Sequence, residues 1–512
     1  MKKYNLFKQA LTILFAVLIV QGCTDKDLDA PFAKQTAVSF FSEGGTDSYN
    51  KAVIGGYAKL TQFYKNYTGV NGTPRTYLNA IALMRDDMLT SNQPDPYEVF
   101  GSLTATDAST SDYYKLAYQL VNRVNLTLEY MAEYGDKVFV DDMELKNTYE
   151  GEARFMRAYM YFHMAINYDT PPLIVNTIKD LAYVPSNSAS GEVLDYAISE
   201  LTAAAVLLPD TWAAPNTGRA TKGSALGILG KALLHKATVN GYNGGDLGLA
   251  LAAFDQIDGL GYSLLSNFGD NFDGEKENGA ESLFELQFGN ADSGNNNIWV
   301  PIDDFNVIGD LGGTWGFYSK HWSIGGARYM LPSAKLEASF EAGDPRMAMT
   351  VAGGIISKYT AKDVVDGAGK TSFNNARILR LADVMLMKAE AMLMSGGDKT
   401  TAIGLLNQVR ERARNSASPA SAVPADRNVA ETDENVILQW IMEERVAELS
   451  GEESWRWYDL IRWHKAGKID MNSWDFSSIQ TTSFDVNKHL LLPFPASEVS
   501  VSSGSLTQNA GY

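Results

Sequence analysis

The sequence predicts a mostly all-α protein, in which pairs of amphipathic helices form a repeated scaffold with long irregular loops and minor β content. Apolar residues recur with helical spacing along most of the chain, and two helical segments are joined by a short glycine turn. Residues 289–330, by contrast, have no helical period. Of the 512 residues, 45% are hydrophobic and 20% are charged, a composition that can bury a large core.

Residues 1–22 have the three parts of a secretory signal peptide. Lys2, Lys3 and Lys8 form the positive start, and the apolar stretch Ala10–Val20 follows. Those 11 residues are too few to cross a bilayer as a helix, which takes about 20. We therefore expect a signal that is cleaved, so residues 1–22 are absent from the folded protein.

Cys23 follows this signal directly and is the only cysteine of the chain, so neither a disulfide nor a cysteine-based metal site is available. With Gly22 before it, Cys23 resembles the lipidated cysteine of a bacterial lipobox. Attached acyl chains would hold the protein stably on a membrane. We expect residues 23–40, which begin with the acid-rich run Thr24–Asp29, to form a tether; an unmodified cysteine after a signal peptide is the alternative.

Residues 41–512 are expected to form a single domain, because no low-complexity tract or second apolar span interrupts them. Apolar positions at three- and four-residue spacing predict a succession of helices. Pro171 and Pro209 end two of them. The predicted segments are 114–131, 152–168, 194–208 and 221–237.

The clearest helix pair comprises residues 377–394 and 401–414, joined by the turn Ser395–Asp398. Pairs of this length, with alanine and glycine at the contacts, are the unit of helical solenoids such as tetratricopeptide (TPR) arrays. We therefore predict a TPR-like scaffold. The stretch between the helical blocks, residues 289–330, is rich in glycine and aromatic residues and is predicted to be a long functional loop.

Composition excludes several functions. The net charge is −18, and it becomes −21 when the signal and its three lysines are removed, so the protein would repel nucleic acid. The five histidines lack metal-ligand spacing, and no Gly-x-Ser-x-Gly motif occurs. A glycosidase needs two carboxylates across a sugar, which the sequence neither supports nor excludes. We expect no enzyme activity, no cofactor and no metal.

Several motifs carry a family resemblance. Residues 443–463, EERVAELSGEESWRWYDLIRW, resemble the C-terminal signature of the SusD/RagB family. The motifs at 151–164, 343–346, 377–393, 402–413, 490–495 and 506–512 are similar to that family in the same order. The resemblance implies a lipid-anchored, outer-membrane, cell-surface protein that captures glycan for a SusC-like TonB-dependent transporter. A surface assembly, adhesion or peptide-capturing lipoprotein of the same fold is the alternative.

The signature is rich in charges and tryptophans at helical spacing, for which we expect a structural role. Its ions are predicted to pair with one another and with neighbouring helices, because a sugar site does not need three interleaved arginines. Those ions are Glu444, Arg445, Glu448, Arg456, Asp459 and Arg462. The helical tryptophans Trp440, Trp455, Trp457 and Trp463 are assigned to the core.

The glycan is expected to bind between two loop segments. A sugar presents apolar C–H faces and a ring of hydroxyls, so its site combines flat aromatic rings with carboxylates or amides. The first wall is predicted to contain Trp299, Asp303, Asp304, Trp315, Phe317, Tyr318 and Trp322. The second is predicted to contain Asn66, Tyr67, Asp86 and Tyr97. For any single aromatic residue, core packing is the alternative.

Overall fold

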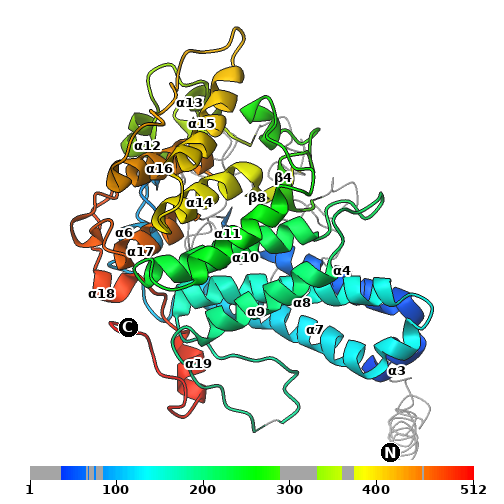
Figure 1. Ribbon diagram of the computed structural model, residues 1–512. Coiled ribbons are helices and arrows are strands. Elements are labelled where there is room, and N and C mark those ends of the chain that lie inside the picture. The colour runs from blue at the N-terminus through cyan, green and yellow to red at the C-terminus, as the bar shows by residue number, and fades with distance from the viewer. Residues whose placement is uncertain are drawn as a thin grey trace, which may run out of the picture.

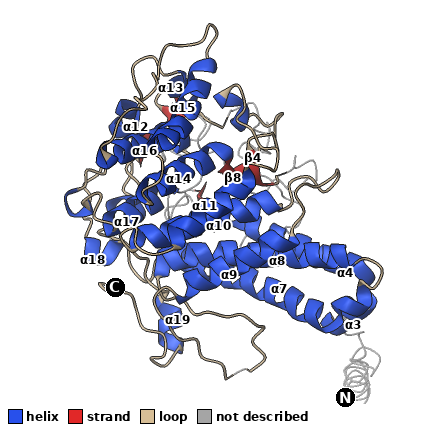
Figure 2. Ribbon diagram, in the orientation of Figure 1, coloured by secondary structure: helices blue, strands red, loops and turns tan. Residues whose placement is uncertain are grey.

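A computed structural model of the protein describes residues 36–64, 67–68, 74–75, 85–180, 182–288, 331–359, 374–452 and 455–512. Helices dominate these residues, as Figure 2 shows, and they pack side by side in a layered stack. None of the helices in the described ranges is long and apolar enough to cross a membrane.

The N-terminal part of the stack is a set of long helices that begin at polar caps. Asp107 caps one helix through the backbone N–H of Thr110, and Asp142 caps the next through that of Leu145. Such caps satisfy N–H groups that the first turn leaves without a partner. The helices are α3 (Ala37–Glu43), α4 (Gly45–Leu60), α7 (Ala108–Val138), α8 (Met143–Tyr168) and α9 (Glu192–Leu207).

The C-terminal part continues the stack with further helix pairs. These are α10 (Lys222–Val239), α11 (Asp246–Ile257), α14 (Leu381–Met394), α15 (Lys399–Asn415), α16 (Glu434–Leu449) and α17 (Trp455–Lys465). Successive helices contact one another from α7 through α11, after which α11 contacts α14 and α14 contacts α15 and α16. Figure 1 shows this progression across the molecule. The predicted TPR-like helical scaffold is confirmed.

The strands in the described ranges form four two-stranded antiparallel sheets. β1 (Tyr67–Thr68) pairs with β2 (Pro74–Arg75), β3 (Leu89–Thr90) with β5 (Leu331–Pro332), β4 (Ser282–Leu286) with β8 (Ala376–Arg380), and β6 (Val351–Ala352) with β7 (Ile355–Ile356). The prediction of a helix from residue 377 was therefore wrong at its start. Residues 377–380 belong to β8, whose residues are all buried, and the helix begins at Leu381.

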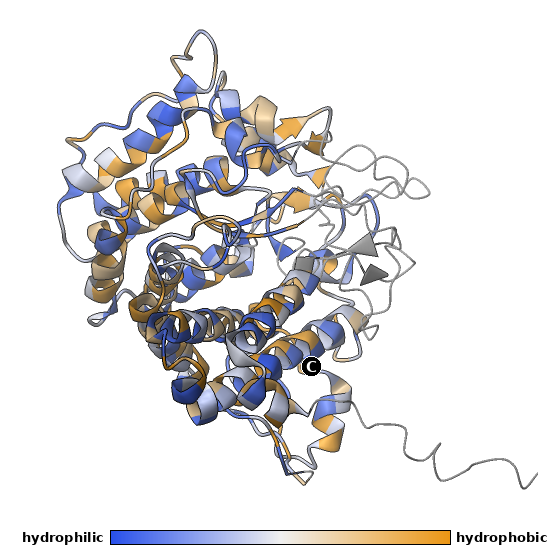
Figure 3. Ribbon diagram, turned by 90° about the vertical axis from the view of Figure 1, so that its right-hand side faces the viewer, coloured by the Kyte–Doolittle hydropathy of each residue, from blue (hydrophilic) through white to orange (hydrophobic). Residues whose placement is uncertain are grey.

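One large hydrophobic core extends through the stack, and two smaller clusters lie around α14, α15 and α16. In Figure 3 hydrophobic and hydrophilic residues alternate along the helices, as expected when each helix buries one face. Short elements complete the described fold: α6 (Pro96–Val99), α12 (Ala334–Ser339), α13 (Pro345–Thr350), α18 (Val486–His489), α19 (Ala496–Val501), and the 3₁₀ turns η1 (Thr61–Tyr64), η4 (Phe268–Phe272) and η8 (Met471–Ser473).

Candidate functional site

Most of the predicted site residues lie outside the described residues. This holds for Cys23, Asn66, Trp299, Asp303, Asp304, Trp315, Phe317, Tyr318 and Trp322. For Tyr67 the structure describes the backbone, which lies in β1 and pairs with Arg75 of β2. The two walls predicted from the sequence therefore remain predictions, except for the two residues discussed next.

Asp86 and Tyr97 are both buried, with 4% and 0% of their surface exposed. The Asp86 carboxylate accepts the backbone N–H groups of Met88 and Leu89, at 2.8 and 3.1 Å. Burial, and to a lesser degree the carboxylate of Asp87, raises the pKa of Asp86 to about 8. Tyr97 donates its hydroxyl to Asp107 at 2.6 Å. Because both side chains are enclosed and engaged within the protein, we no longer assign them to the ligand site.

The neighbouring Asp87 is the centre of a polar cluster that the sequence analysis missed. Its carboxylate accepts two hydrogen bonds from Arg456, at 2.8 and 2.9 Å, and one from the indole N–H of Trp474 at 3.1 Å. Lys335 lies 2.7 Å away and over the Trp474 ring. Burial by itself raises the pKa of Asp87, but Arg456 and Lys335 outweigh it and hold this pKa below its ordinary value. No local sequence pattern signals a cluster drawn from such distant segments.

A cavity of about 290 Å³ lies beside this cluster, between α12, α16, α17 and the segment of Trp474. Its walls are mainly apolar and include Met88, Met442, Val446, Trp463 and Trp474. The cations at its rim, Lys335 and Arg456, are both engaged by the carboxylate of Asp87. The cavity therefore offers apolar surface and few polar groups that could orient a polyol.

The charged residues of the C-terminal signature form buried ion pairs, as predicted. Arg445 bonds Asp383 at 2.8 Å and Asp459 at 2.7 Å. Arg462 pairs with Asp459 at 2.8 Å and with Glu390. Because buried charges are tolerated only when they are paired, these contacts give the signature a structural role.

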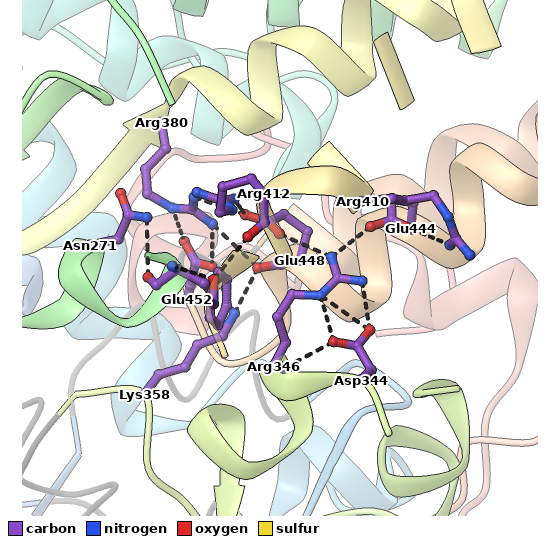
Figure 4. A network of polar contacts seen from close by, with 12 residues as sticks. Asn271, Asp344, Arg346, Lys358, Arg380, Arg410, Arg412, Glu444, Glu448 and Glu452 are labelled. Atoms are coloured by element: carbon purple, nitrogen blue, oxygen red, sulfur yellow. Dashed lines mark hydrogen bonds and ion pairs between the residues drawn. The ribbon is translucent and has the colours of Figure 1, made fainter. Parts of the chain in front are cut away.

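Glu448 is the centre of a larger buried ion network, drawn in Figure 4. Arg346 donates to its carboxylate at 3.1 Å, Arg380 at 3.0 Å, and Arg412 also binds it. Burial opposes its ionisation, yet the surrounding arginines hold the pKa of Glu448 at about 2. The rest of the buried ion network consists of Glu281, Asp344, Lys358, Arg410, Glu444 and Glu452.

The helical tryptophans were expected to pack in the core, and they are buried or partly buried. Trp455, Trp457 and Trp463 are buried, with at most 5% of their surface exposed. Trp440 is partly buried and packs against the clusters around α14 and α15. Within the described ranges, no group of three or more histidine, cysteine, aspartate or glutamate residues is placed to hold a metal ion.

The sequence matches the profiles of two families of known proteins. The sequence profile of the SusD family matches residues 311–512, and that of a SusD-like family described as "Starch-binding associating with outer membrane" matches residues 46–234. The chain belongs to the SusD/RagB family. A SusD-like protein from Formosa agariphila is 24% identical over the full length of both chains. One from Bacteroides ovatus is 27% identical over 72% of this chain and 68% of its own.

Solved structures of SusD-like proteins share the fold over nearly the whole chain. A SusD homolog from Bacteroides thetaiotaomicron is 18% identical, with a TM-score of 0.75 over 94% of this chain and 99% of its own. Surface glycan-binding protein A from the same organism, solved in complex with laminarihexaose, is 19% identical, with a TM-score of 0.67 over 90% and 99%. The chain therefore has the SusD-like fold, and its TPR-like helix stack is part of that fold.

Proposed function

We propose that the protein is a cell-surface, lipid-anchored glycan-binding protein of the outer membrane, which captures oligo- or polysaccharide and delivers it to a SusC-like TonB-dependent transporter. The observation that carries the proposal is membership of the SusD/RagB family, supported by two family profiles in the expected order. The whole-chain likeness to a surface glycan-binding protein solved with laminarihexaose supports it further.

A binding role without catalysis agrees with the way the charged residues are used. The carboxylates Glu444 and Glu448 and the arginines around them are consumed by one another in the buried ion network. The pair Asp383 and Asp459 is likewise engaged by Arg445. A glycosidase would need two carboxylates that face a bound sugar, and these groups do not.

The ligand face is proposed to lie in the aromatic segment that contains Trp315, with Asn66 and Tyr67 on a second wall. Flanking glycines, Gly313 and Gly316, offer no bulk that would bury the Trp315 indole. An indole of this kind can stack on the apolar face of a sugar and contributes on the order of 1 to 3 kcal/mol.

Calorimetric titration with soluble polysaccharides tests this face. Trp315→Ala is expected to weaken binding of the recognised glycan by roughly 10- to 100-fold, since 1.4 kcal/mol corresponds to a factor of ten. Tyr183→Ala is the matched control, because Tyr183 is an exposed aromatic residue on the described surface. A Trp315→Ala protein that keeps its affinity, or that melts many degrees lower, would move the ligand face elsewhere.

The anchor and the partner each have a separate test. Cys23→Ala is expected to abolish incorporation of labelled fatty acid and to release the protein from the membrane fraction. The wild-type protein is expected to co-purify with a TonB-dependent barrel from detergent-extracted outer membranes. Labelling of the Cys23→Ala protein would contradict the lipid anchor, whereas purification without a barrel would contradict delivery.

A further inference from the structure

A second cavity, of about 250 Å³, lies on a part of the protein to which the sequence analysis assigned no function. It is enclosed by the loop between α9 and α10, by residues that follow α11, and by β4 with the turn before it. β4 belongs to the β4–β8 sheet, which contacts α10 and is labelled toward the right of the molecule in Figure 1. We refer to it as the α9–α10 cavity.

The loop that forms one wall is fixed by internal contacts. Arg219 donates to the Glu152 carboxylate of α8 at 2.7 and 2.6 Å, and its guanidinium stacks over the Trp212 ring at 4.6 Å. The backbone N–H of Lys222 bonds the carbonyl of Pro209 at 2.8 Å, which ties the two ends of the loop together. A loop closed and packed in this way is a preformed wall, so a ligand would not have to order it on binding.

Two half-buried aromatic rings line the cavity. Trp212 is held by the hydrogen bond from its indole N–H to the Ala220 carbonyl, at 2.8 Å. The hydroxyl of Tyr262 lies 3.0 Å from that of Thr221. The polar atoms of both rings are already bonded within the protein, and Arg219 covers one face of the Trp212 indole, so the rings offer the cavity the apolar surface that remains uncovered.

Polar groups of the same loop, between α9 and α10, retain their hydrogen-bonding capacity. The side chains of Asp210, Thr211 and Thr217 are exposed and form no hydrogen bond with any other residue that the structure describes. Asn278 pairs its amide with that of Gln287, at 2.9 and 3.0 Å, and thereby keeps a fixed orientation. The cavity thus combines aromatic faces with hydroxyl, carboxylate and amide groups.

The charge of the α9–α10 cavity walls determines which class of ligand the cavity favours. Arg219 is the lining cation, and its charge is balanced by Glu152. Glu285 is buried and pairs with Arg377 at 3.5 Å, so the exposed carboxylate of Asp210 is the charge left on the cavity side. A phosphate, a nucleotide or an acidic sugar would be repelled by such walls. A neutral sugar ring matches them, since it presents C–H groups to aromatic faces and hydroxyls to carboxylates and amides.

We propose that the α9–α10 cavity is an additional subsite for one ring of a neutral saccharide, an inference that rests on the proposed glycan-binding function. β4 lines this cavity and ends at Leu286, Phe288 follows it, and Trp299, the first residue of the predicted aromatic wall, comes 11 residues after Phe288. Eleven residues span at most about 40 Å, so a polysaccharide of modest length can reach both places. Two linked contacts raise the affinity for a long chain above that of either contact alone.

The test is native electrophoresis in gels that contain a neutral soluble polysaccharide, with starch, laminarin, xylan and galactomannan as probes. The double variant Asp210→Ala/Thr217→Val removes two rim groups that take part in no side-chain hydrogen bond of the described fold. It is expected to melt as the wild type does and to lose about tenfold in affinity for the polysaccharide that retards the wild type. Combining it with Trp315→Ala is expected to abolish retardation.

The outcomes separate this subsite from the proposed function. Retardation of the double variant equal to that of the wild type, with Trp315→Ala alone abolishing it, would overturn the subsite and leave glycan binding intact. A wild-type protein that none of the probes retards would contradict both. As a second arm, a hexasaccharide of the recognised glycan should lose less affinity than the polysaccharide in the double variant, and an equal loss for both would overturn the linked contact.

Discussion

The buried ion network around Glu448 and the α9–α10 cavity both contain arginines, carboxylates and aromatic rings. They differ in whether their polar side chains are already bonded within the protein. In the network, the carboxylate of Glu448 is fully enclosed and bound by three arginines. At the cavity, the one arginine is also paired, but Asp210 and Thr217 are exposed and form no side-chain hydrogen bond with the described residues. Both regions place guanidinium groups over aromatic rings.

This difference shows that residue type does not determine the role of a charged group. A carboxylate whose oxygens are all used inside the protein stabilises the fold, whereas one that keeps free acceptors beside an aromatic face can recognise a ligand. Substitutions in the network should therefore change stability, and substitutions at the cavity rim should change binding.

The largest effect is expected for Glu448→Ala, which removes the centre of the network. Three buried arginines would lose a partner, and breaking such a buried pair costs about 3 to 5 kcal/mol of unfolding free energy. Glu443→Ala on the same helix is the control, since Glu443 is 45% exposed and contacts Arg427 and Gln439 at the surface. Denaturant unfolding of both variants measures the difference. Equal, small losses would show that the network contributes no more than a surface ion pair.

The pH dependence of stability is the next effect in size. The folded protein holds the pKa of Glu448 and that of Asp383 at about 2, below their ordinary values near 4. The stability that these groups contribute is present above pH 4.5 and is lost as pH falls toward 2, by up to about 3 kcal/mol for Glu448. Unfolding free energies at pH 7, 4 and 3 should show the decline. A flat profile over this range would contradict the charge pairing.

Asp86 provides a titration of opposite sign. Its pKa is raised to about 8, so the stability it contributes is complete below its ordinary pKa near 4 and declines as pH rises toward 8. Asp86→Asn keeps an acceptor for the two backbone N–H groups and removes the cost of keeping this carboxyl protonated at pH 7. We expect a gain on the order of 1 kcal/mol at pH 7 and unchanged glycan affinity. Weaker glycan binding in a fully folded Asp86→Asn protein would return Asp86 to the ligand site.

The sequence predicted the helices well and the long-range contacts poorly, for a physical reason. Periodicity is a local property, so helices such as α7 and α8 were located, although the predicted ranges 114–131 and 152–168 leave out both ends of α7 and the first nine residues of α8. It could not show that Arg456 would meet Asp87, 369 positions away. Burial likewise depends on what packs above a segment, which is why the enclosed positions of Asp86 and Tyr97 could not be predicted from their loop-like context. Helical spacing did reveal that the signature charges pair, because that pairing partly occurs within and between neighbouring helices.

The α9–α10 cavity was not predicted, because its residues form only a weak pattern in the sequence. Trp212 lies between Pro209 and Pro215 among small residues, a context typical of a surface loop. An aromatic residue in such a loop is a hint of recognition, but the cavity also needs Tyr262 and Asn278 from two other segments. Only the fold brings these together.

The smallest expected effects come from two threonines of the cavity wall that lie four positions apart. Thr221 caps α10: its hydroxyl accepts the backbone N–H of Ser224 at 3.2 Å, and the Ser224 hydroxyl accepts that of Thr221 at 3.0 Å. Thr221→Val should therefore cost about 1 kcal/mol, as the loss of an N-cap does. Thr217→Val should change the unfolding free energy by less than about 0.5 kcal/mol, because Thr217 is exposed and its side chain bonds no described residue. Thermal melts of the two variants distinguish a hydroxyl that holds the fold from one left for a ligand, and an equal loss from both would mean that Thr217 also supports the loop.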